Sequence, residues 1–516
     1  MTSETASERL SLATLIRLAG TSASVTLPAI DPAGLSIGIV HLGIGAFHRA
    51  HQAVFTEDAA AAAGETNWGI LGVTGRSESV VDQLRPQDCL YGVLQKGAEH
   101  TSLRVVGSVR EVAWPGRDSQ LVVETLARPT THIATLTITE KGYLRAADGR
   151  IDLDLPAVQH DRDLVNSELR GEPRLHGDEA FPASHTPIGL LVRGLARRFR
   201  ENARPFTLLS CDNLVDNGSV TGAVVGSLVA ALEPSTTRDE FEAWLKASVT
   251  FPSSMVDRIS PATTDADRAE AAQLLGLGDA ALVVAEPFIQ WVIEDNFGGP
   301  RPAWEKAGAI LTTDVSPYER TKLRILNSTH SLLAYLGALK GYATIAQAIA
   351  DPVLRAAARC VIDEDILPTL ETPPGLDLAE YSDSVLERFT NPNLPHTTVQ
   401  VAMDGSQKLP TRILGTVVDC LAAAHTPEGL ALTVAAWITF VVSTLTVHGT
   451  RLDDPLAELL QKTAARADAI AEDPVGLVER FLALEQIFPA DVRESAAFRD
   501  AIVRQLGRVQ ELIAAS

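Results

Sequence analysis

Three polar residues that can act on a small molecule lie in one largely apolar stretch, residues 316–336, SPYERTKLRILNSTHSLLAYL. They are Lys322, Asn327 and His330. At about 100° per residue, the stretch predicts an amphipathic helix with Lys322 in the middle of the apolar arc and the other two on its shoulder. The arc comprises Ile325, Leu326, Leu332, Leu333 and Leu336, and the opposite, polar side comprises Arg324, Ser328, Ser331 and Tyr335. A polar cluster on an apolar face is a candidate active site.

The chemistry that a buried lysine serves is proton transfer. Burial disfavours the ammonium form and lowers the pKa of lysine towards neutrality, where the amine acts as a general base. The alternative is a lysine that extends its ammonium past the edge of a core or pairs with a carboxylate. Ser316, Pro317 and Glu319 match a capping box at the start of the helix, so Glu319 has a structural interpretation as well.

The first element that must position such a site is a glycine turn near the start of the chain. Residues 35–42, LSIGIVHL, predict a buried parallel strand that leads directly into GIGAFHRAHQ. Gly43 and Gly45 supply the tight turn and the close backbone approach that a pyrophosphate needs at a helix amino terminus. His48 replaces the third glycine of G-x-G-x-x-G, so an ordinary strand-to-helix turn is the alternative. The predicted cofactor contacts in this helix are Phe47 and Arg49.

Further apolar runs follow at the spacing of βαβ units. They are residues 68–73, 103–109, 132–139 and 206–210. Ligands of an open α/β sheet bind at the carboxyl ends of its strands, so the polar residues after these runs are candidate contacts. They are Arg76, Glu78, Glu140, Lys141 and Asn213. Glu78 would hold the ribose hydroxyls of NAD and Arg76 the phosphate of NADP; we favour NAD. Solvated loop charges and an Asx turn at Asn213 are the alternatives.

The order of these patterns predicts an α/β protein with a Rossmann-type, doubly wound amino-terminal domain and a mostly all-helical carboxyl-terminal domain. We place the domains at residues 1–309 and 310–516, with a ligand cleft between the halves. Residues 286–295 suggest a strand or interface segment. Residues 156–184 are polar and predict a long surface loop. Residues 429–447 carry no charge, but five hydroxyl side chains favour a buried helix over a membrane span.

Composition limits the function. The formal charge of −21 over 516 residues argues against a nucleic-acid partner, which needs a basic face. The four cysteines form no CxxC pair, so we expect neither a disulfide framework nor a thiolate metal site. The amino terminus does not resemble a signal peptide. We therefore expect a cytoplasmic protein, a monomer or weak homo-oligomer, that binds neither membrane nor metal.

Taken together, seven motifs resemble the polyol-specific long-chain dehydrogenases, a family with mannitol 2-dehydrogenase, fructuronate reductase, tagaturonate reductase and arabinitol dehydrogenase among its members. The motifs are GIGAFHRAHQ, TITEKGY, SCDNLVDNG, FPSSMVDRISP, EPFIQWVIEDNF, the K-x4-N-x2-H of the central stretch, and DGSQKLP. They extend from about residue 37 to the carboxyl-terminal helices. The resemblance implies NAD(P)-dependent, metal-independent interconversion of a secondary alcohol and a ketone.

The resemblance also implies roles for single residues. Lys322 corresponds to the general base, and Asn213 and Asn327 to an oxyanion hole that holds the substrate oxygen. His330 orients the substrate. The residues that correspond to binders of the rest of the polyol are Asp257 and Lys408, and those that correspond to acids linked to proton movement are Glu319 and Glu140.

The substrate is where this chain departs from the family pattern. Gln400 stands ahead of the DGS motif, where mannitol dehydrogenases often carry an arginine. This segment, with His396, is similar to fructuronate reductases as well, and a substrate carboxylate would need an added cation such as Arg412 or His396. We expect a mannitol 2-dehydrogenase (D-mannitol to D-fructose), with fructuronate reductase (a D-mannonate oxidoreductase) as the alternative. A non-catalytic dinucleotide-binding protein is the alternative of another class.

Overall fold

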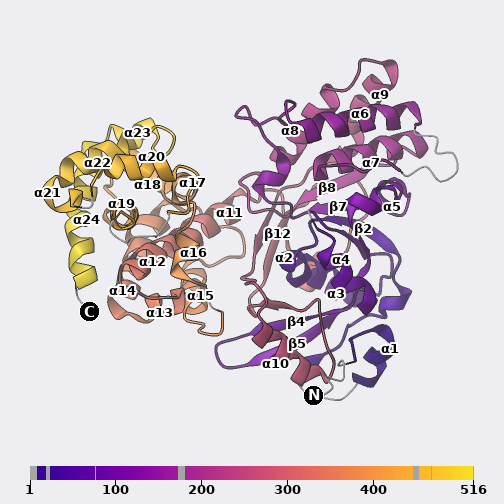
Figure 1. The fold of residues 1–516 in the computed structure, drawn as a ribbon, viewed down its shortest axis with the longest axis horizontal. Helices are drawn as coiled ribbons and strands as arrows, with labels where there is room; N and C mark the ends of the chain where they lie inside the picture. Colours follow the sequence, from indigo (N-terminus) through magenta and orange to yellow (C-terminus); the bar gives the residue numbers. More distant parts are fainter. Residues whose placement is uncertain are drawn as a thin grey trace, which may run out of the picture. The chain divides into compact units, whose positions relative to one another are not determined.

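The computed structural model describes residues 8–18, 24–75, 77–172, 181–394, 396–445, 452–466 and 468–514. The chain forms two compact units, Met1–Val315 and Ser316–Ser516. In Figure 1 the first unit combines sheets with helices, and the second consists of helices. The predicted fold class, an α/β half followed by a helical half, is confirmed.

The main sheet of the first unit has six parallel strands in the order β6-β3-β2-β7-β8-β9. They are β2 (Ile37–Leu42), β3 (Gly69–Val73), β6 (Val109–Ala113), β7 (Ile133–Leu136), β8 (Phe206–Ser210) and β9 (Val249–Thr250). The first of them, β2, lies between β3 and β7, so the strand order reverses at its edge. In sheets of this kind the ligand crevice opens at the carboxyl ends of the strands, at such a reversal.

Both faces of this sheet are buried, which explains why its strands have nearly continuous apolar sequences. Val40 and Leu42 of β2 face one core together with the helices α5 to α9, whereas Ile39 faces a second core with α3. The helices of this unit are α1 (Leu12–Leu15), α2 (Ala46–Ala50), α3 (Gln52–Ala63), α4 (Ser79–Leu84), α5 (Pro115–Ala127), α6 (Pro156–Arg170), α7 (Pro187–Glu201), α8 (Asn217–Ala230), α9 (Thr236–Ser248) and α10 (Asp265–Leu275).

Two smaller sheets complete the first unit. One has the order β1-β5-β4-β11 and the other β10-β12-β13. Their strands are β1 (Val25–Thr26), β4 (Tyr91–Lys96), β5 (Thr101–Val106), β10 (Ser254–Asp257), β11 (Val283–Ala285), β12 (Gln290–Glu294) and β13 (Ile310–Thr312). The strand expected within residues 286–295 is confirmed as β12.

Two sequence predictions about this unit are wrong. Residues 103–109 are not one strand: β5 ends at Val106, and β6 begins at Val109 in a different sheet. The chain turns at Gly107, whose N–H donates to the buried carboxylate of Glu57 at 2.6 Å. Residues 156–184 are not simply a surface loop, because Pro156–Arg170 forms α6. Its Val158, Val165 and Leu169 recur at helical spacing and pack into the core, a pattern masked by the charged residues between them.

The second unit is a bundle around two buried helices, α12 (Ser328–Leu339) and α19 (Glu428–Ser443), which pack against each other and against α24 (Ala496–Ala514). The other helices are α11 (Ser316–Lys322), α13 (Ile345–Ala350), α14 (Pro352–Cys360), α15 (Leu378–Phe389), α16 (Thr398–Ala402), α17 (Gly405–Leu409), α18 (Gly415–Ala422), α20 (Ala457–Ala464), α21 (Ala469–Glu472), α22 (Pro474–Leu482) and α23 (Ala490–Arg493). The expected buried helix is thus confirmed as α19. In the part of the chain that the structure describes, no helix combines the length and apolar character that crossing a membrane requires.

Candidate active site

The turn after β2 has a backbone shape that requires glycine. Gly43 has φ 100°, and a Cβ there would lie 2.1 Å from the carbonyl oxygen of Thr137. Its N–H donates to the carbonyl of Val73 at 2.8 Å, which fixes the turn against the neighbouring strand. Gly45 follows with an ordinary φ of −82° as the N-cap of α2, and a Cβ there would meet only the Gly43 oxygen, at 3.8 Å. The turn therefore leaves open space beside the backbone of Gly45, as a pyrophosphate needs.

The residues that follow the turn explain the missing third glycine. The ring of His48 stacks on that of His41 in β2, with centroids 3.3 Å apart, and both rings are buried. Burial lowers the pKa of His41 to about 3 and that of His48 well below its usual value, so both rings are neutral. An imidazole therefore fills the space where the fingerprint has glycine.

Phe47 and Arg49 were predicted to contact the cofactor. Phe47 stacks on the ring of His51, with centroids 5.0 Å apart. Arg49 is buried, and its guanidinium donates to the carbonyls of Ala281 and Gly45. The bond to Ala281 ties α2 to the chain just before β11, which favours a structural role for Arg49 over the predicted cofactor contact.

Asp212, directly after β8, organises the neighbouring strand ends, although it was not among the predicted site residues. Its carboxylate accepts the N–H groups of Ile138 and Thr139 at 3.1 and 2.7 Å, and the hydroxyl of Tyr143 donates to it at 2.9 Å. Burial raises the pKa of Asp212, and these three donors oppose that shift. Asp212 thereby joins the loops after β7 and β8. The sequence signal was an acid immediately after a buried strand, in SCDN.

The predicted residues on these two loops are exposed. Glu140 and Lys141 lie in the 3-10 turn Glu140–Tyr143, and Asn213 follows Asp212 directly. Because β2, β7 and β8 are adjacent and parallel, these residues and the glycine turn lie at the same edge of the sheet.

Two further predicted residues of the first unit lie on other elements. Glu78, at the start of α4, forms an ion pair with Arg117. Asp257 is 4% exposed at the end of β10, opposite Gln290 of β12. Arg76 lies outside the described residues.

In the second unit, the predicted central helix is continuous but contains a π-helical segment. α11 ends at Lys322, the π segment spans Leu323–Asn327, and α12 follows. Lys322 is 9% exposed and Asn327 6%, so the expected burial of the lysine is confirmed. π-helical turns inside α-helices are frequent at functional sites.

The predicted polar face of this helix is wrong. Arg324, Ser328, Ser331 and Tyr335 are all buried. The cause is tertiary, because α13, α14, α16 and α19 all pack against α12. The π segment also changes the residues per turn, so angles counted at about 100° per residue do not hold beyond Lys322.

Four polar side-chain atoms on this helix are buried without a partner among the described residues, and two of them belong to predicted site residues. Neither Nδ2 of Asn327 nor Nε2 of His330 has a hydrogen-bond partner among the described residues. The His330 ring stacks between Phe389 and His396, with centroid distances of 4.9 and 5.5 Å. Burial is the main cause that lowers the pKa of His330 well below its usual value, and it also lowers the pKa of His396. Buried polar atoms are nearly always satisfied, so these two suit the hydroxyl groups of a ligand.

Two cationic side chains reach the same helix region. The Nη1 of Arg412 donates to the hydroxyl of Ser331 at 3.3 Å, and that hydroxyl donates to the carbonyl of Asn327 at 3.0 Å. The ammonium of Lys408 donates to the carbonyl of Val401 at 3.0 Å. The structure thus brings Asn327, His330, His396 and Arg412 together around α12, with Lys408 electrostatically coupled to Arg412 and His330.

Two predicted residues of this unit are less buried than Lys322 and Asn327. Gln400 is exposed in α16, and Glu319 is half-buried in α11. Their assigned roles stay predictions.

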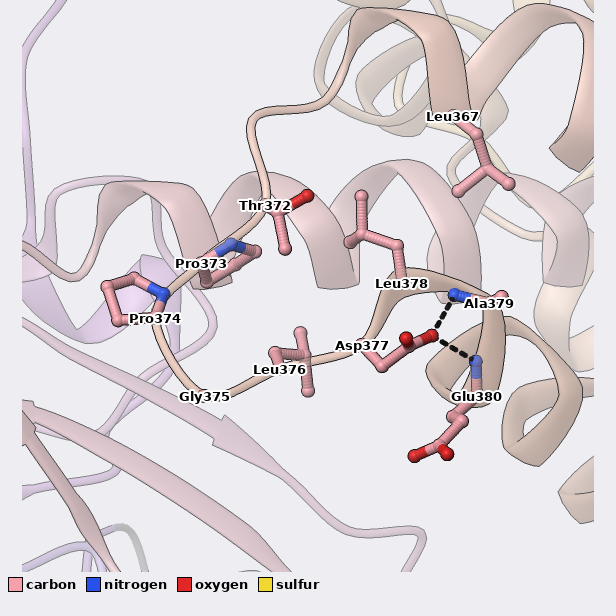
Figure 2. A pocket seen from close by; sticks show the side chains of 10 residues that line it. All are labelled: Leu367, Thr372, Pro373, Pro374, Gly375, Leu376, Asp377, Leu378, Ala379 and Glu380. Atoms are coloured by element: carbon pink, nitrogen blue, oxygen red, sulfur yellow. Dashed lines mark hydrogen bonds between the residues drawn. The ribbon is translucent and has the colours of Figure 1, made fainter.

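A hollow of about 830 Å³ lies on the loop before α15, lined by Leu367 and residues 372–380 (Figure 2). It contains none of the predicted site residues. The carboxylate of Asp377 accepts the N–H groups of Ala379 and Glu380 at 2.8 and 2.9 Å, which caps α15. Since this acid serves the helix end, we place the candidate site at the cluster around α12 instead.

Comparison with known proteins identifies a family that matches both halves of the chain. The family model of the mannitol dehydrogenase Rossmann domain matches residues 37–306, and that of the mannitol dehydrogenase C-terminal domain matches residues 314–510. D-mannonate oxidoreductase of Escherichia coli (strain K12) is 40% identical over 485 residues, which cover 93% of this chain and 94% of that protein. Mannitol dehydrogenase 2 of Saccharomyces cerevisiae is 34% identical over 497 residues, covering 95% of this chain and 93% of that protein.

A solved structure matches as well. Pseudomonas fluorescens mannitol 2-dehydrogenase, in a ternary complex with NAD and D-mannitol, has a TM-score of 0.81 at 34% identity, over 98% of this chain and 99% of that one. The predicted resemblance is confirmed. The chain therefore belongs to the mannitol dehydrogenase family, a family of oxidoreductases that act on CH–OH donors.

Proposed function

We propose that this chain moves a hydride between NAD and a secondary-alcohol carbon of a six-carbon polyhydroxy substrate. The observation that carries the proposal is the pair of unpartnered buried atoms, Nδ2 of Asn327 and Nε2 of His330, on the helix that holds the buried Lys322. A base and two hydrogen-bonding groups are what the oxidation of an alcohol to a ketone needs.

In the proposed reaction, Lys322 takes the proton of the substrate hydroxyl. Asn327 and Asn213 donate hydrogen bonds to the oxygen, which stabilises its developing negative charge. His330 is neutral, so it orients a neighbouring hydroxyl without adding charge. Glu319 and Glu140 are assigned to carry the proton onward, and Asp257 and Gln400 to bind the remaining hydroxyls. A dinucleotide held at the turn of Gly43 and Gly45 would supply the hydride acceptor.

For the dinucleotide, the residues of the first unit fit. Gly43 allows the turn, and the open space at Gly45 admits a pyrophosphate, with Phe47 and Lys141 beside the cofactor. We propose NAD as the cofactor, with Glu78 on the ribose. The ternary complex of the Pseudomonas fluorescens relative with NAD supports this choice.

Two substrate classes are candidates. D-Mannitol, oxidised to D-fructose, is supported by the relatives named mannitol dehydrogenase. D-Mannonate is supported by the 40% identical relative named D-mannonate oxidoreductase and by the cations around α12. We also propose a cytoplasmic location, which the free cysteines support.

Exchange of the lysine tests the proposal. Following NADH absorbance with each substrate, we expect Lys322→Ala to reduce turnover by about a hundredfold or more, because a general base is lost. NADH affinity should be unchanged. Lys462→Ala, at an exposed position of α20, is the matched control and should keep full activity.

Full turnover in Lys322→Ala would refute the assignment of the base. NADH binding without turnover of either substrate by the wild-type chain would indicate the non-catalytic dinucleotide-binding protein instead.

A further inference from the structure

Two cations in the helical unit lie close together without an acidic partner. Lys408 and Arg412 are both half-buried and four residues apart, at the junction of α17 with the π-helical segment Pro410–Leu414. Within the residues that the structure describes, neither forms an ion pair. Each donates one hydrogen bond to a neutral oxygen, Arg412 to the hydroxyl of Ser331 and Lys408 to the carbonyl of Val401.

Two other cations of this unit with little-exposed side chains, Arg324 and Lys340, are paired. Arg324 forms an ion pair with Asp419, although its own side chain is only 11% exposed. Lys340 lies 2.8 Å from the carboxylate of Asp351. Lys408 and Arg412 therefore differ from these two cations of the same bundle, because no carboxylate pairs with them. A bound anion would balance their charge.

The acids nearest Lys408 do not supply that anion. Asp404, Asp453 and Asp454 favour its charged form from a distance, but none forms an ion pair with it. The Asp454 carboxylate accepts the N–H groups of Ser406 and Leu456, each at 2.8 Å, and the Ser406 hydroxyl at 2.5 Å. The Asp454 carboxylate thus links the start of α17 to the chain before α20.

This arrangement disfavours the charged forms of both groups. Burial lowers the pKa of Lys408, and the neighbouring Arg412 lowers it further. Burial also lowers the pKa of Arg412. Two like charges in a partly desolvated site are unfavourable unless an anion joins them. The chain carries a net charge of −21, so two neighbouring cations without an ion pair to an acid are a local exception among the described residues.

We propose that Arg412, assisted by Lys408, binds the carboxylate of the substrate, so that the chain acts on a polyhydroxy monocarboxylate and discriminates against neutral hexitols. The inference rests on the proposed function, because it assigns the far end of the same substrate. Arg412 bonds to Ser331 on the same helix as His330, and its charge lowers the pKa of His330, so the guanidinium lies near the ring that is proposed to orient the substrate hydroxyls. The guanidinium fork matches a carboxylate bidentately, and its other donors have no hydrogen-bond partner among the described residues.

Comparing an acid with its neutral counterpart tests the proposal. We expect the wild-type chain to have a higher kcat/KM for D-mannonate than for D-mannitol. Arg412→Gln should lose about ten- to a hundredfold in kcat/KM for D-mannonate and change that for D-mannitol far less, because only the acid uses the guanidinium. Arg412→Lys, which keeps the charge, should lie between the two.

The control is Arg359→Gln, which removes an arginine that pairs with Asp383 on the surface between α14 and α15. It should leave both substrates unaffected. An equal loss for both substrates in Arg412→Gln, or a wild-type preference for D-mannitol, would overturn the carboxylate site. Absence of turnover on either substrate would instead refute the proposed function.

A binding measurement tests the site without any variant and without turnover. The four-carbon acid erythronate and its neutral counterpart erythritol differ at the carboxylate. By calorimetry with the NADH-bound wild-type chain, we expect erythronate to bind at least about tenfold more tightly. Equal affinity for the two would overturn the proposal, whatever the activity measurements show.

Discussion

Replacing Gly45 by alanine adds one methyl group at the turn between β2 and α2. The change distinguishes the contribution of this glycine to stability from its proposed contribution to dinucleotide binding. The new Cβ would meet only the carbonyl oxygen of Gly43, at 3.8 Å, which is an ordinary contact. The φ of −82° suits alanine. The remaining cost is the exchange of an N-cap glycine for alanine, so we expect the free energy of unfolding to fall by less than about 1 kcal/mol.

Dinucleotide binding should respond differently. If the pyrophosphate lies against the backbone at Gly45, the methyl group occupies its space. We expect a loss of at least about 1.4 kcal/mol, a tenfold weaker Kd for NADH. The assays are urea unfolding for stability and a fluorescence titration with NADH for affinity, on the same preparation.

Alanine substitutions at two further glycines serve as comparisons for Gly45→Ala. Gly43→Ala would place its Cβ 2.1 Å from a main-chain oxygen at φ 100°, so it should destabilise the protein by more than about 2 kcal/mol. Gly226→Ala, in α8 with nothing within 4 Å of the new Cβ, should stabilise by up to about 1 kcal/mol and leave NADH affinity unchanged. If Gly45→Ala binds NADH as tightly as the wild type, the dinucleotide does not lie at this turn and the proposed cofactor site is refuted.

The remaining predictions concern Asp212 and Lys408. In Asp212→Asn the amide NH2 must face one of the two main-chain N–H donors, so urea unfolding should show a loss of about 1–3 kcal/mol, and exposed Asp239→Asn should show almost none. Burial, together with Arg412, lowers the pKa of Lys408 from 10.5 to about 8, so its charged form, and with it erythronate affinity, should decline as pH rises through about 8. Lys408→Met should bind weakly and without this dependence; an unchanged wild-type affinity across that range would contradict the reasoning. Because the folded pKa is below the unfolded one, Lys408 destabilises the fold below about pH 8, and this cost disappears as pH rises towards 10.5.

Local sequence determined the elements and the residues that carry chemistry. The apolar run before Gly43 predicted β2 and its turn, because a strand buried on both faces has a continuous apolar sequence and a reversal at φ 100° admits only glycine. The uncharged stretch around residue 436 predicted a buried helix, found as α19. The burial of Lys322 followed from its leucine neighbours. Each of these inferences depends on residues that are close in the sequence.

Tertiary packing decided what periodicity could not. Ser328 and Ser331 have a sequence pattern typical of a solvent-facing side, yet α13, α16 and α19 cover that side of the helix. Likewise, the α6 core positions were hidden among charged residues, and Arg49 was expected at the cofactor but bonds to Ala281, far away in the sequence.

The candidate site divides in the same way. The types of Lys322, Asn327 and His330 could be recognised from one stretch of sequence. That Nδ2 of Asn327 and Nε2 of His330 lack protein partners, and that Arg412 reaches Ser331 without a carboxylate, depends on contacts between distant segments. A sequence lists the donors and charges of a protein, but only the folded chain determines which of them remain unsatisfied, and Asn327 and His330 provide two such groups in the proposed site.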